Sequence, residues 1–386
     1  MKKTALVLSG GGFKGAFQVG ALQVLRDRWP EIAPGRAPLS FDIVAGVSVG
    51  SLNGLLVAQR QFGELEKLWN DVARNGVEEI YTSDFIDTQT DPRDPDPELK
   101  LRLKWSDIRK HFPATTRNLL LRAIFNRKSI LREFTREFQS FRAVADNGPL
   151  RDKLLRLAKR EAVTDCIYRC GYVSLNDGKY YSTSHDGFRS NQDFADGVLA
   201  STAMPVVWEP VGAVHTTQGI HRQLVDGGIR NSSPLGDVIR EIGRQESEDE
   251  YTIVIINCSS GKVAEEDFTD KNIVQIALRS LVDVAITEIF NNDIREFLDK
   301  NYILKQFRDK LPDEPLYDYN YHTGGQGKPL RYFNAIVIGP DANVLGDTLT
   351  ASAAQIEHRI RHGREKAAAA LEKHLKKREA QKSTVV

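Results

Sequence analysis

The chain has 386 residues, of which 41% are apolar, so it can bury the core of one large domain or two ordinary ones. Its formal net charge of +1 excludes a strong overall attraction to nucleic acid, and we expect no such partner. The first apolar run is too short for a secretory leader, and no window resembles a membrane span. Three sparse cysteines, Cys166, Cys170 and Cys258, are expected to be reduced core thiols. We therefore predict a cytoplasmic protein that is either soluble or bound to membranes only peripherally.

Apolar, β-branched runs alternate along the chain with stretches of helical pattern. Strands are predicted at residues 4–9, 41–46, 166–175, 222–228, 251–259 and 332–339. Helices are predicted at 15–25, 48–58, 271–310 and 350–380, the last of them with solvated final turns. Near-continuous apolar strands between helices are typical of a sheet that is covered on both faces. The pattern predicts an α/β fold with a mostly parallel central sheet flanked by helices on both faces, in three layers.

The block from 62 to 159 differs from its surroundings and is predicted to be a charged helical insertion or lid. It would divide a catalytic domain into residues 1–61 and 160–345, which a C-terminal helix and tail (346–386) follow. Between residues 100 and 137, eleven Lys and Arg stand against three Asp and Glu. Because basic amphipathic helices bind anionic lipid, we expect residues 100–137 to contact a membrane surface. A lid with solvated arginines is the alternative.

The segment GGGFKG at 10–15 lies between a predicted strand and a predicted helix. It satisfies the Gly-x-Gly-x-x-Gly pattern of dinucleotide-binding turns. Such a unit needs an acidic residue at the end of the second strand, whereas this second strand ends in GVSVG. A phosphate-binding P-loop is also disfavoured, because no Gly-Lys-Ser/Thr follows. We therefore predict no nucleotide, metal or other cofactor here.

The segment GVSVG at 46–50 is a Gly-x-Ser-x-Gly motif between a predicted strand and a predicted helix. This context is typical of a nucleophile elbow, a tight turn that exposes a serine hydroxyl at a helix N-terminus. The residues two before and two after the serine must be very small, as Gly46 and Gly50 are. Ser48 is therefore the predicted nucleophile.

A serine that attacks an acyl carbonyl creates an oxyanion, which needs preorganised hydrogen-bond donors. Glycine amides at a helix N-terminus can supply them without a side chain in the way. This predicts a role for the glycines of the GGGFKG segment. Gly10, Gly11 and Gly12 are predicted to bind the oxyanion, and Gly15 is predicted to support the turn. Lys14 either adds positive potential or lies over the helix surface.

The serine also needs a base to accept its proton. None of the eight histidines lies in a recognisable motif, and His221 is expected to be structural. Asp226 ends a predicted strand and is followed by Gly227 and Gly228, at the strand end where α/β sites form. Because burial raises the pKa of a carboxyl group, Asp226 could act as the base near neutral pH.

Taken together, four blocks in order resemble the patatin-like phospholipase family. They are GGGFKG, GVSVG, ASTAMPVVWEPV at 200–211 and VDGGIRNSSP at 225–234. The resemblance implies a patatin-like three-layer fold, a dyad of Ser48 and Asp226 without histidine, no cofactor, and an acyl pocket shaped by residues 204–208. It implies a lipid acyl hydrolase acting on phospholipids or lysophospholipids. The alternatives are a soluble carboxylesterase or thioesterase with the same dyad, and a catalytically dead lipid-binding protein.

Overall fold

The computed structural model describes residues 2–36, 38–95, 142–245, 249–271, 273–310, 315–320 and 323–383. The predicted membrane-binding stretch 100–137 lies outside the described residues, and so does the rest of 96–141 within the predicted insertion. No helix in the described part of the chain is long and apolar enough to cross a membrane.

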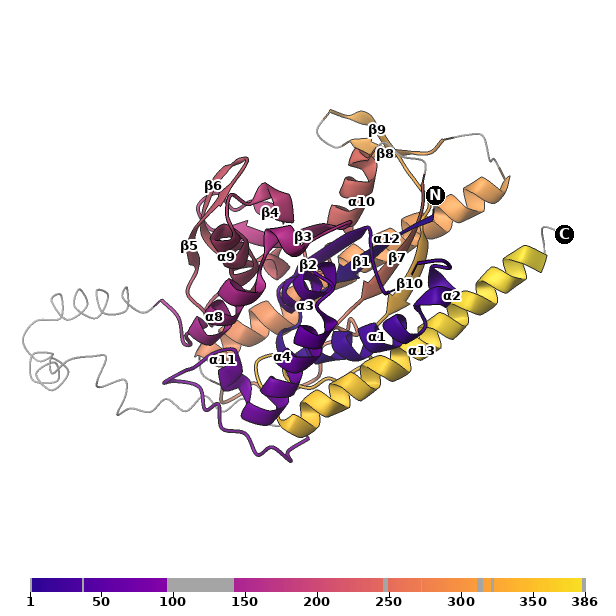
Figure 1. Cartoon of the computed structure of the whole chain (residues 1–386). Coiled ribbons are helices and arrows are strands. Elements are labelled where there is room, and N and C mark those ends of the chain that lie inside the picture. Colours follow the sequence, from indigo (N-terminus) through magenta and orange to yellow (C-terminus); the bar gives the residue numbers. More distant parts are fainter. Residues whose placement is uncertain are drawn as a thin grey trace, which may run out of the picture.

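The centre of the molecule is a mixed sheet, whose described strands run in the order β10-β7-β1-β2-β3-β6-β5, with β4 beside β3 (Figure 1). Neighbours from β10 to β3 are parallel, whereas β4, β5 and β6 are antiparallel to their partners. All six predicted strands are present, and the mostly parallel sheet is confirmed. The strands of this sheet are β1 (Lys2–Leu8), β2 (Ile43–Val47), β3 (Ile167–Ser174), β4 (Tyr180–Ser184), β5 (Val211–Thr216), β6 (Gly219–Asp226), β7 (Glu250–Ile256) and β10 (Asn334–Ile338). A separate hairpin is formed by β8 (Tyr317–Asn320) and β9 (Gly325–Pro329).

Helices cover both faces of the sheet, as predicted. Alternate residues of β1 serve two cores: Leu6 and Leu8 face one of them, and Ala5 and Val7 face the other. This explains why the strand is apolar without a break. The first core includes buried residues of α1 (Ala16–Asp27), α3 (Val49–Ala58), α4 (Phe62–Asn75), α8 (Gly148–Leu157), α9 (Asn191–Thr202) and α13 (Ala353–Ser383). The second includes buried residues of α10 (Leu235–Arg244) and α12 (Ile286–Lys310).

Short helical turns complete the connections. They are α2 (Trp29–Ile32), η1 (Gly12–Gly15), η2 (Val77–Glu79), η3 (Arg160–Ala162), η4 (His185–Gly187) and η5 (Gly227–Ile229). The helix predicted over 271–310 is divided: a π-helical segment, η6 (Arg279–Ala285), lies between α11 (Ile273–Leu278) and α12. Wide turns of this kind occur frequently at functional sites.

The C-terminal helix is more buried than the sequence predicted. α13 packs beside α1 (Figure 1), and Ala367 and Leu371 in its later turns are fully buried. One stripe of α13 therefore belongs to the core, and only its other faces are solvated. The three cysteines are free, as expected, and Cys170 and Cys258 are buried.

Candidate active site

Two strands meet end to end along one edge of β3. β2 is parallel to β3, and its last residue, Val47, pairs with Gly171. β6 is antiparallel to β3, and its last residue, Asp226, pairs with the next residue, Tyr172. β4 pairs with β3 over both positions, so β2 and β6 must share the opposite edge. Because they arrive from opposite directions, their carboxyl ends meet, and this brings the predicted nucleophile and base together.

Ser48 forms the tight turn between β2 and α3. Its backbone angles are φ 55° and ψ −132°, a conformation that non-glycine residues rarely adopt and that is often found at functional sites. A Cβ at Gly46 would lie 2.2 Å from the Gly50 carbonyl oxygen, and one at Gly50 would lie 2.3 Å from the Leu8 carbonyl oxygen. The turn therefore needs glycine at both positions. The N-terminus of α3 points its partial positive charge toward the serine.

The glycine loop passes close to this turn, and its amides differ in what they bind. The Gly10 amide donates to the Ser232 carbonyl over 3.1 Å. Within the described residues, the amides of Gly11 and Gly12 have no hydrogen-bond acceptor. The Gly10 amide is therefore already occupied in this conformation. Of the three predicted oxyanion donors in this described loop, only the amides of Gly11 and Gly12 are open to an oxyanion.

Gly12 is the position of the loop where a side chain is least acceptable. Its φ of 53° is left-handed, and a Cβ there would lie 2.2 Å from the Thr348 carbonyl oxygen. We expect Gly12→Ala to lower the free energy of unfolding by about 1–3 kcal/mol, as overpacked sites do. Gly243→Ala is the control, because Gly243 lies in α10 with no neighbour within 4 Å. Urea unfolding of both variants tests this, and equal stability of the two would contradict it.

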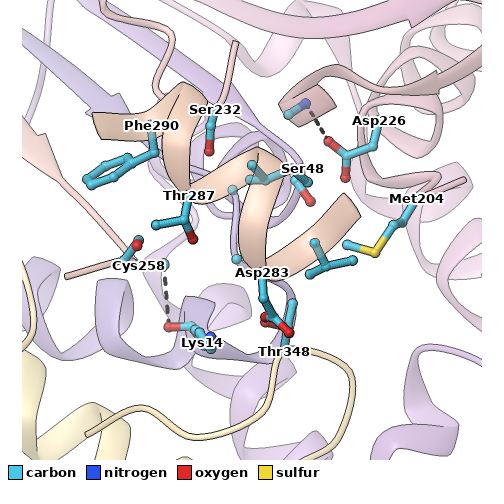
Figure 2. A pocket seen from close by; sticks show the side chains of 16 residues that line it. Lys14, Ser48, Met204, Asp226, Ser232, Cys258, Asp283, Thr287, Phe290 and Thr348 are labelled. Carbon is cyan, nitrogen blue, oxygen red and sulfur yellow. Dashed lines mark hydrogen bonds between the residues drawn. The ribbon is translucent and has the colours of Figure 1, made fainter. Parts of the chain in front are cut away.

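Asp226 is buried at the end of β6, with 1% of its surface exposed. Its Oδ1 accepts a 2.7 Å hydrogen bond from the Gly228 amide, whereas its Oδ2 has no hydrogen-bond partner among the described residues. Burial raises the pKa of Asp226 to about 7, although the Ser48 hydroxyl and the Gly228 amide both act to lower it. The Ser48 hydroxyl is thus near enough to influence the carboxylate, but it does not form a hydrogen bond of normal geometry. Figure 2 shows the two groups turned toward one another.

His221 lies elsewhere. Its Nδ1 is 3.0 Å from the Tyr172 hydroxyl, and its ring stacks on Tyr181 at a centroid distance of 3.8 Å. It does not line the pocket that contains Ser48 and Asp226. This agrees with a structural role for His221 and leaves the carboxylate as the base candidate beside Ser48.

The pocket around Ser48 and Asp226, which we call the central pocket, is covered by η6 and the first turns of α12. Val282, Ile286 and Phe290 contribute apolar surface to its lining. Asp283 and Thr287 contribute polar groups (Figure 2). Asp283 pairs with Arg279 over 3.2 Å. The sequence predicted this helix but gave no indication that it covers the site.

Ser48 lines both the central pocket and a second cavity, which is apolar. The apolar cavity extends from Ser48 between α3 and α4; its lining includes Leu52, Leu68, Trp69, Val72, Met204 and Trp208. Of the predicted pocket residues 204–208, Met204 and Trp208 line this cavity, whereas Pro205, Val206 and Val207 are not among its lining residues. A polar cavity of about 600 Å³ adjoins the central pocket, because the two share Lys14 and Asp283 among their lining residues. The lining of the polar cavity also includes Lys262, Glu265, Arg279 and Asp347.

Lys14 stands where the central pocket and the polar cavity join, rather than over the helix surface. Burial lowers its pKa, which the nearby carboxylates of Asp283 and Asp347 act to raise. In the described part of the chain no carboxylate lies within ion-pair distance of its ammonium group. Lys14 therefore lies beside the site, in the place that the first of the two sequence-based alternatives requires.

The remaining predicted glycines support the site by allowing close packing. A Cβ at Gly15 would lie 2.4 Å from the Val49 side chain, and one at Gly227 would lie 2.5 Å from the Gly171 carbonyl oxygen. Gly228 donates its amide to Asp226. Within the described residues, no group of three His, Cys, Asp or Glu could hold a metal ion.

A serine on a strand-to-helix turn, a buried carboxylate beside it and glycine amides without an acceptor among the described residues are together typical of a serine hydrolase site on an α/β sheet. The chain belongs to the patatin-like phospholipase family, whose model matches residues 6–239. This range contains all the predicted site residues, from Gly10 to Gly228. Membership of this family implies a lipid acyl hydrolase.

Three solved structures are similar over nearly the whole chain. VipD from Legionella pneumophila is 16% identical, with a TM-score of 0.37, and the match covers 96% of this chain and 67% of VipD. The type III effector ExoU is 14% identical, with a TM-score of 0.31, and the match covers 97% of this chain and 53% of ExoU. Human GIVD cytosolic phospholipase A2 is 12% identical, with a TM-score of 0.37, and the match covers 97% of this chain and 60% of the phospholipase. The chain therefore spans between about half and two thirds of these proteins. A search of the curated proteins found no match.

Proposed function

We propose that the protein is a serine acyl hydrolase that cleaves ester bonds of phospholipids or lysophospholipids. Family membership supports the class of reaction. The observation that carries the mechanism concerns the buried Asp226, which lies in the same pocket as the Ser48 hydroxyl: its Oδ2 has no hydrogen-bond partner in the part of the chain that the structure describes. A free carboxylate oxygen at this place is suited to accept the serine proton.

The reaction then proceeds in two halves. Ser48 Oγ attacks the ester carbonyl while its proton passes to Asp226, and the amides of Gly11 and Gly12 stabilise the oxyanion. When the carbon–oxygen bond to the alcohol breaks, the leaving alkoxide takes the proton from Asp226. A water molecule then gives a proton to Asp226 and attacks the acyl-enzyme, and Ser48 leaves with that proton. Every step uses groups of the chain itself.

The two cavities support a substrate with one apolar and one polar end. The apolar cavity between α3 and α4 suits an acyl chain, and the polar cavity beyond Lys14 suits a charged headgroup. A soluble carboxylesterase or thioesterase would gain little from the second cavity. The contact of residues 100–137 with an anionic membrane stays a prediction from the sequence.

We expect kcat/KM to rise with pH through about 7, because Asp226 must be ionised to act as a base and its pKa is raised to about 7. The assay is release of fatty acid from a short-chain phospholipid at constant ionic strength. A rate that is already maximal at about pH 5 would contradict this assignment, because a carboxyl group with an ordinary pKa would then be the base.

Substrate class is tested by offering the purified protein phospholipid vesicles and, separately, short soluble esters and thioesters. Mass spectrometry of the released acids is the readout. The proposal expects faster release from phospholipid. Turnover of soluble esters or thioesters alone would favour the esterase or thioesterase alternative. No turnover of any of these substrates would favour the lipid-binding alternative.

A further inference from the structure

The hydroxyl of Ser201 joins the backbone of the nucleophile turn to the central sheet. Ser201 is fully buried near the C-terminal end of α9. Its Oγ accepts a 3.0 Å hydrogen bond from the Ser48 amide and donates a 2.5 Å hydrogen bond to the Gly171 carbonyl on β3. Ser201 lines neither the central pocket nor the apolar or polar cavity.

This bridge lies at the point where β2 leaves the sheet. The ladder between β2 and β3 ends with Val47 opposite Gly171. Ser48 then turns away with a positive φ, so its amide points to the Ser201 hydroxyl instead of to a strand. A buried amide or carbonyl without a partner is costly. The hydroxyl satisfies both groups and acts as a spacer between β3 and the turn.

The segment 201–203, which contains Ser201, also forms a hydrogen bond with the backbone of the predicted base. The Asp226 amide donates a 2.8 Å hydrogen bond to the Ala203 carbonyl, two residues after Ser201. One end of α9 therefore binds the backbone of Ser48 through a side chain and the backbone of Asp226 through a carbonyl. Because the two contacts are so near in sequence, they share one rigid support.

We propose that Ser201 is a positioning residue, which sets the separation between the Ser48 hydroxyl and the Asp226 carboxylate. This inference rests on the proposed function, because it assumes that these two groups exchange a proton. Without the Ser201 hydroxyl, the Ser48 amide and the Gly171 carbonyl can satisfy one another only by approaching. This would draw the turn toward β3 and alter the geometry of the pair.

Ser201→Ala is the variant that tests this, with kcat and KM measured on a monomeric short-chain phospholipid. We expect kcat to fall about 10- to 100-fold, because a misplacement of about 1 Å can have an effect of this size. KM should change by less than about twofold, because Ser201 does not line the substrate cavities.

The pH profile gives a second readout that a purely structural role would not change. The Ser48 hydroxyl helps to lower the pKa of Asp226, so its displacement should move the rising limb of activity to higher pH. The other titratable groups of the central pocket are Lys14, Cys258 and Asp283. Asp293 does not line the pocket, but it accepts a hydrogen bond from the amide of Ser233, next to the lining residue Ser232. Ser201 forms none of its hydrogen bonds with these four groups, so a shift of the rising limb in the variant would report on Asp226.

Ser190→Ala is the matched control. Ser190 caps the other end of α9, where its side chain accepts a 3.0 Å hydrogen bond from the Asp193 amide. Its removal should lower the melting temperature but leave kcat and the pH profile as in the wild type. Ser201→Thr, which retains the hydroxyl oxygen, should keep at least about half of the wild-type kcat if that oxygen is what matters.

The inference is overturned if Ser201→Ala retains kcat within about twofold of the wild type. It is also overturned if the kcat of Ser190→Ala falls by as large a factor as that of Ser201→Ala. It is also overturned if folded Ser201→Thr has less than about a tenth of the wild-type kcat, and this comparison with the wild type decides the matter if the alanine variant does not fold. Ser48→Ala is assayed in parallel. Wild-type turnover by Ser48→Ala would refute the proposed function itself, whereas an inactive Ser48→Ala beside a fully active Ser201→Ala refutes only the role of Ser201.

Discussion

Ser48→Ala is expected to reduce release of fatty acid from phospholipid by about 10⁴-fold or more, because removal of a serine nucleophile leaves only the contribution of binding and the oxyanion site. The turn itself should persist in the variant. Its glycines and the contact of the Ser48 amide with Ser201 do not involve the lost hydroxyl. Fatty acid released per mole of protein, measured by mass spectrometry, is the readout.

The control for this variant is the stability of the folded protein. Ser48→Ala should unfold at nearly the same urea concentration as the wild type, so that lost activity reports chemistry and not unfolding. An activity within about tenfold of the wild type would show that another group attacks the ester.

Asp226→Asn is expected to lower kcat by about 10³- to 10⁴-fold, while making the folded protein more stable at neutral and higher pH. The amide has nearly the same shape, and its oxygen can still accept from the Gly228 amide, but it cannot take the serine proton. The gain in stability follows from burial, because the native protein must hold a carboxylate that would be better solvated in the unfolded chain.

The sign of this effect can be worked out from the raised pKa. Asp226 has a pKa of about 7 when folded, against 3.8 for the ordinary group, so the folded state holds the proton more tightly. Its stabilising contribution is complete below the lower value and is lost as the pH rises through the higher one. The melting temperature of Asp226→Asn should therefore exceed that of the wild type at about pH 8 by more than at about pH 5. A variant that is less stable at both values, or fully active, would contradict the assignment.

Asp283→Asn separates the two carboxylates of the central pocket. Asp283 pairs with Arg279 and is partly exposed, whereas Asp226 is buried with a free oxygen. If the base is Asp226, the Asp283 variant should lose far less activity than Asp226→Asn. The opposite order would transfer the role of base to Asp283.

The residues that the local motifs singled out lie together in the structure, and each motif has a steric cause. Gly46 and Gly50 bracket the serine since any Cβ there would collide with backbone atoms, and this requirement is visible in one short segment. Asp226 was singled out from the sequence as the candidate base because it ends a predicted strand and precedes two glycines. The strands were equally predictable from the sequence, since β1 and β2 are buried on both faces and therefore appear as unbroken apolar runs.

Contacts between distant segments could not be predicted in this way. Nothing in the glycine loop indicates that the Gly10 amide is occupied by Ser232, which lies far along the chain. The antiparallel direction of β6 is a property of the assembled sheet, and so is its end-to-end meeting with β2. Ser201 lies within a block that the sequence had singled out, yet its link to Ser48 became visible only once α9 was placed against β3.

The central claim is that Ser48 becomes acylated, and labelling with a fluorophosphonate tests it most directly. Such a probe reacts with activated serines, and peptide mass spectrometry identifies the labelled residue. The account predicts one adduct, on the peptide containing Ser48, which forms far more slowly in Asp226→Asn and is absent in Ser48→Ala. An adduct on another residue, together with undiminished release of fatty acid by Ser48→Ala, would contradict it.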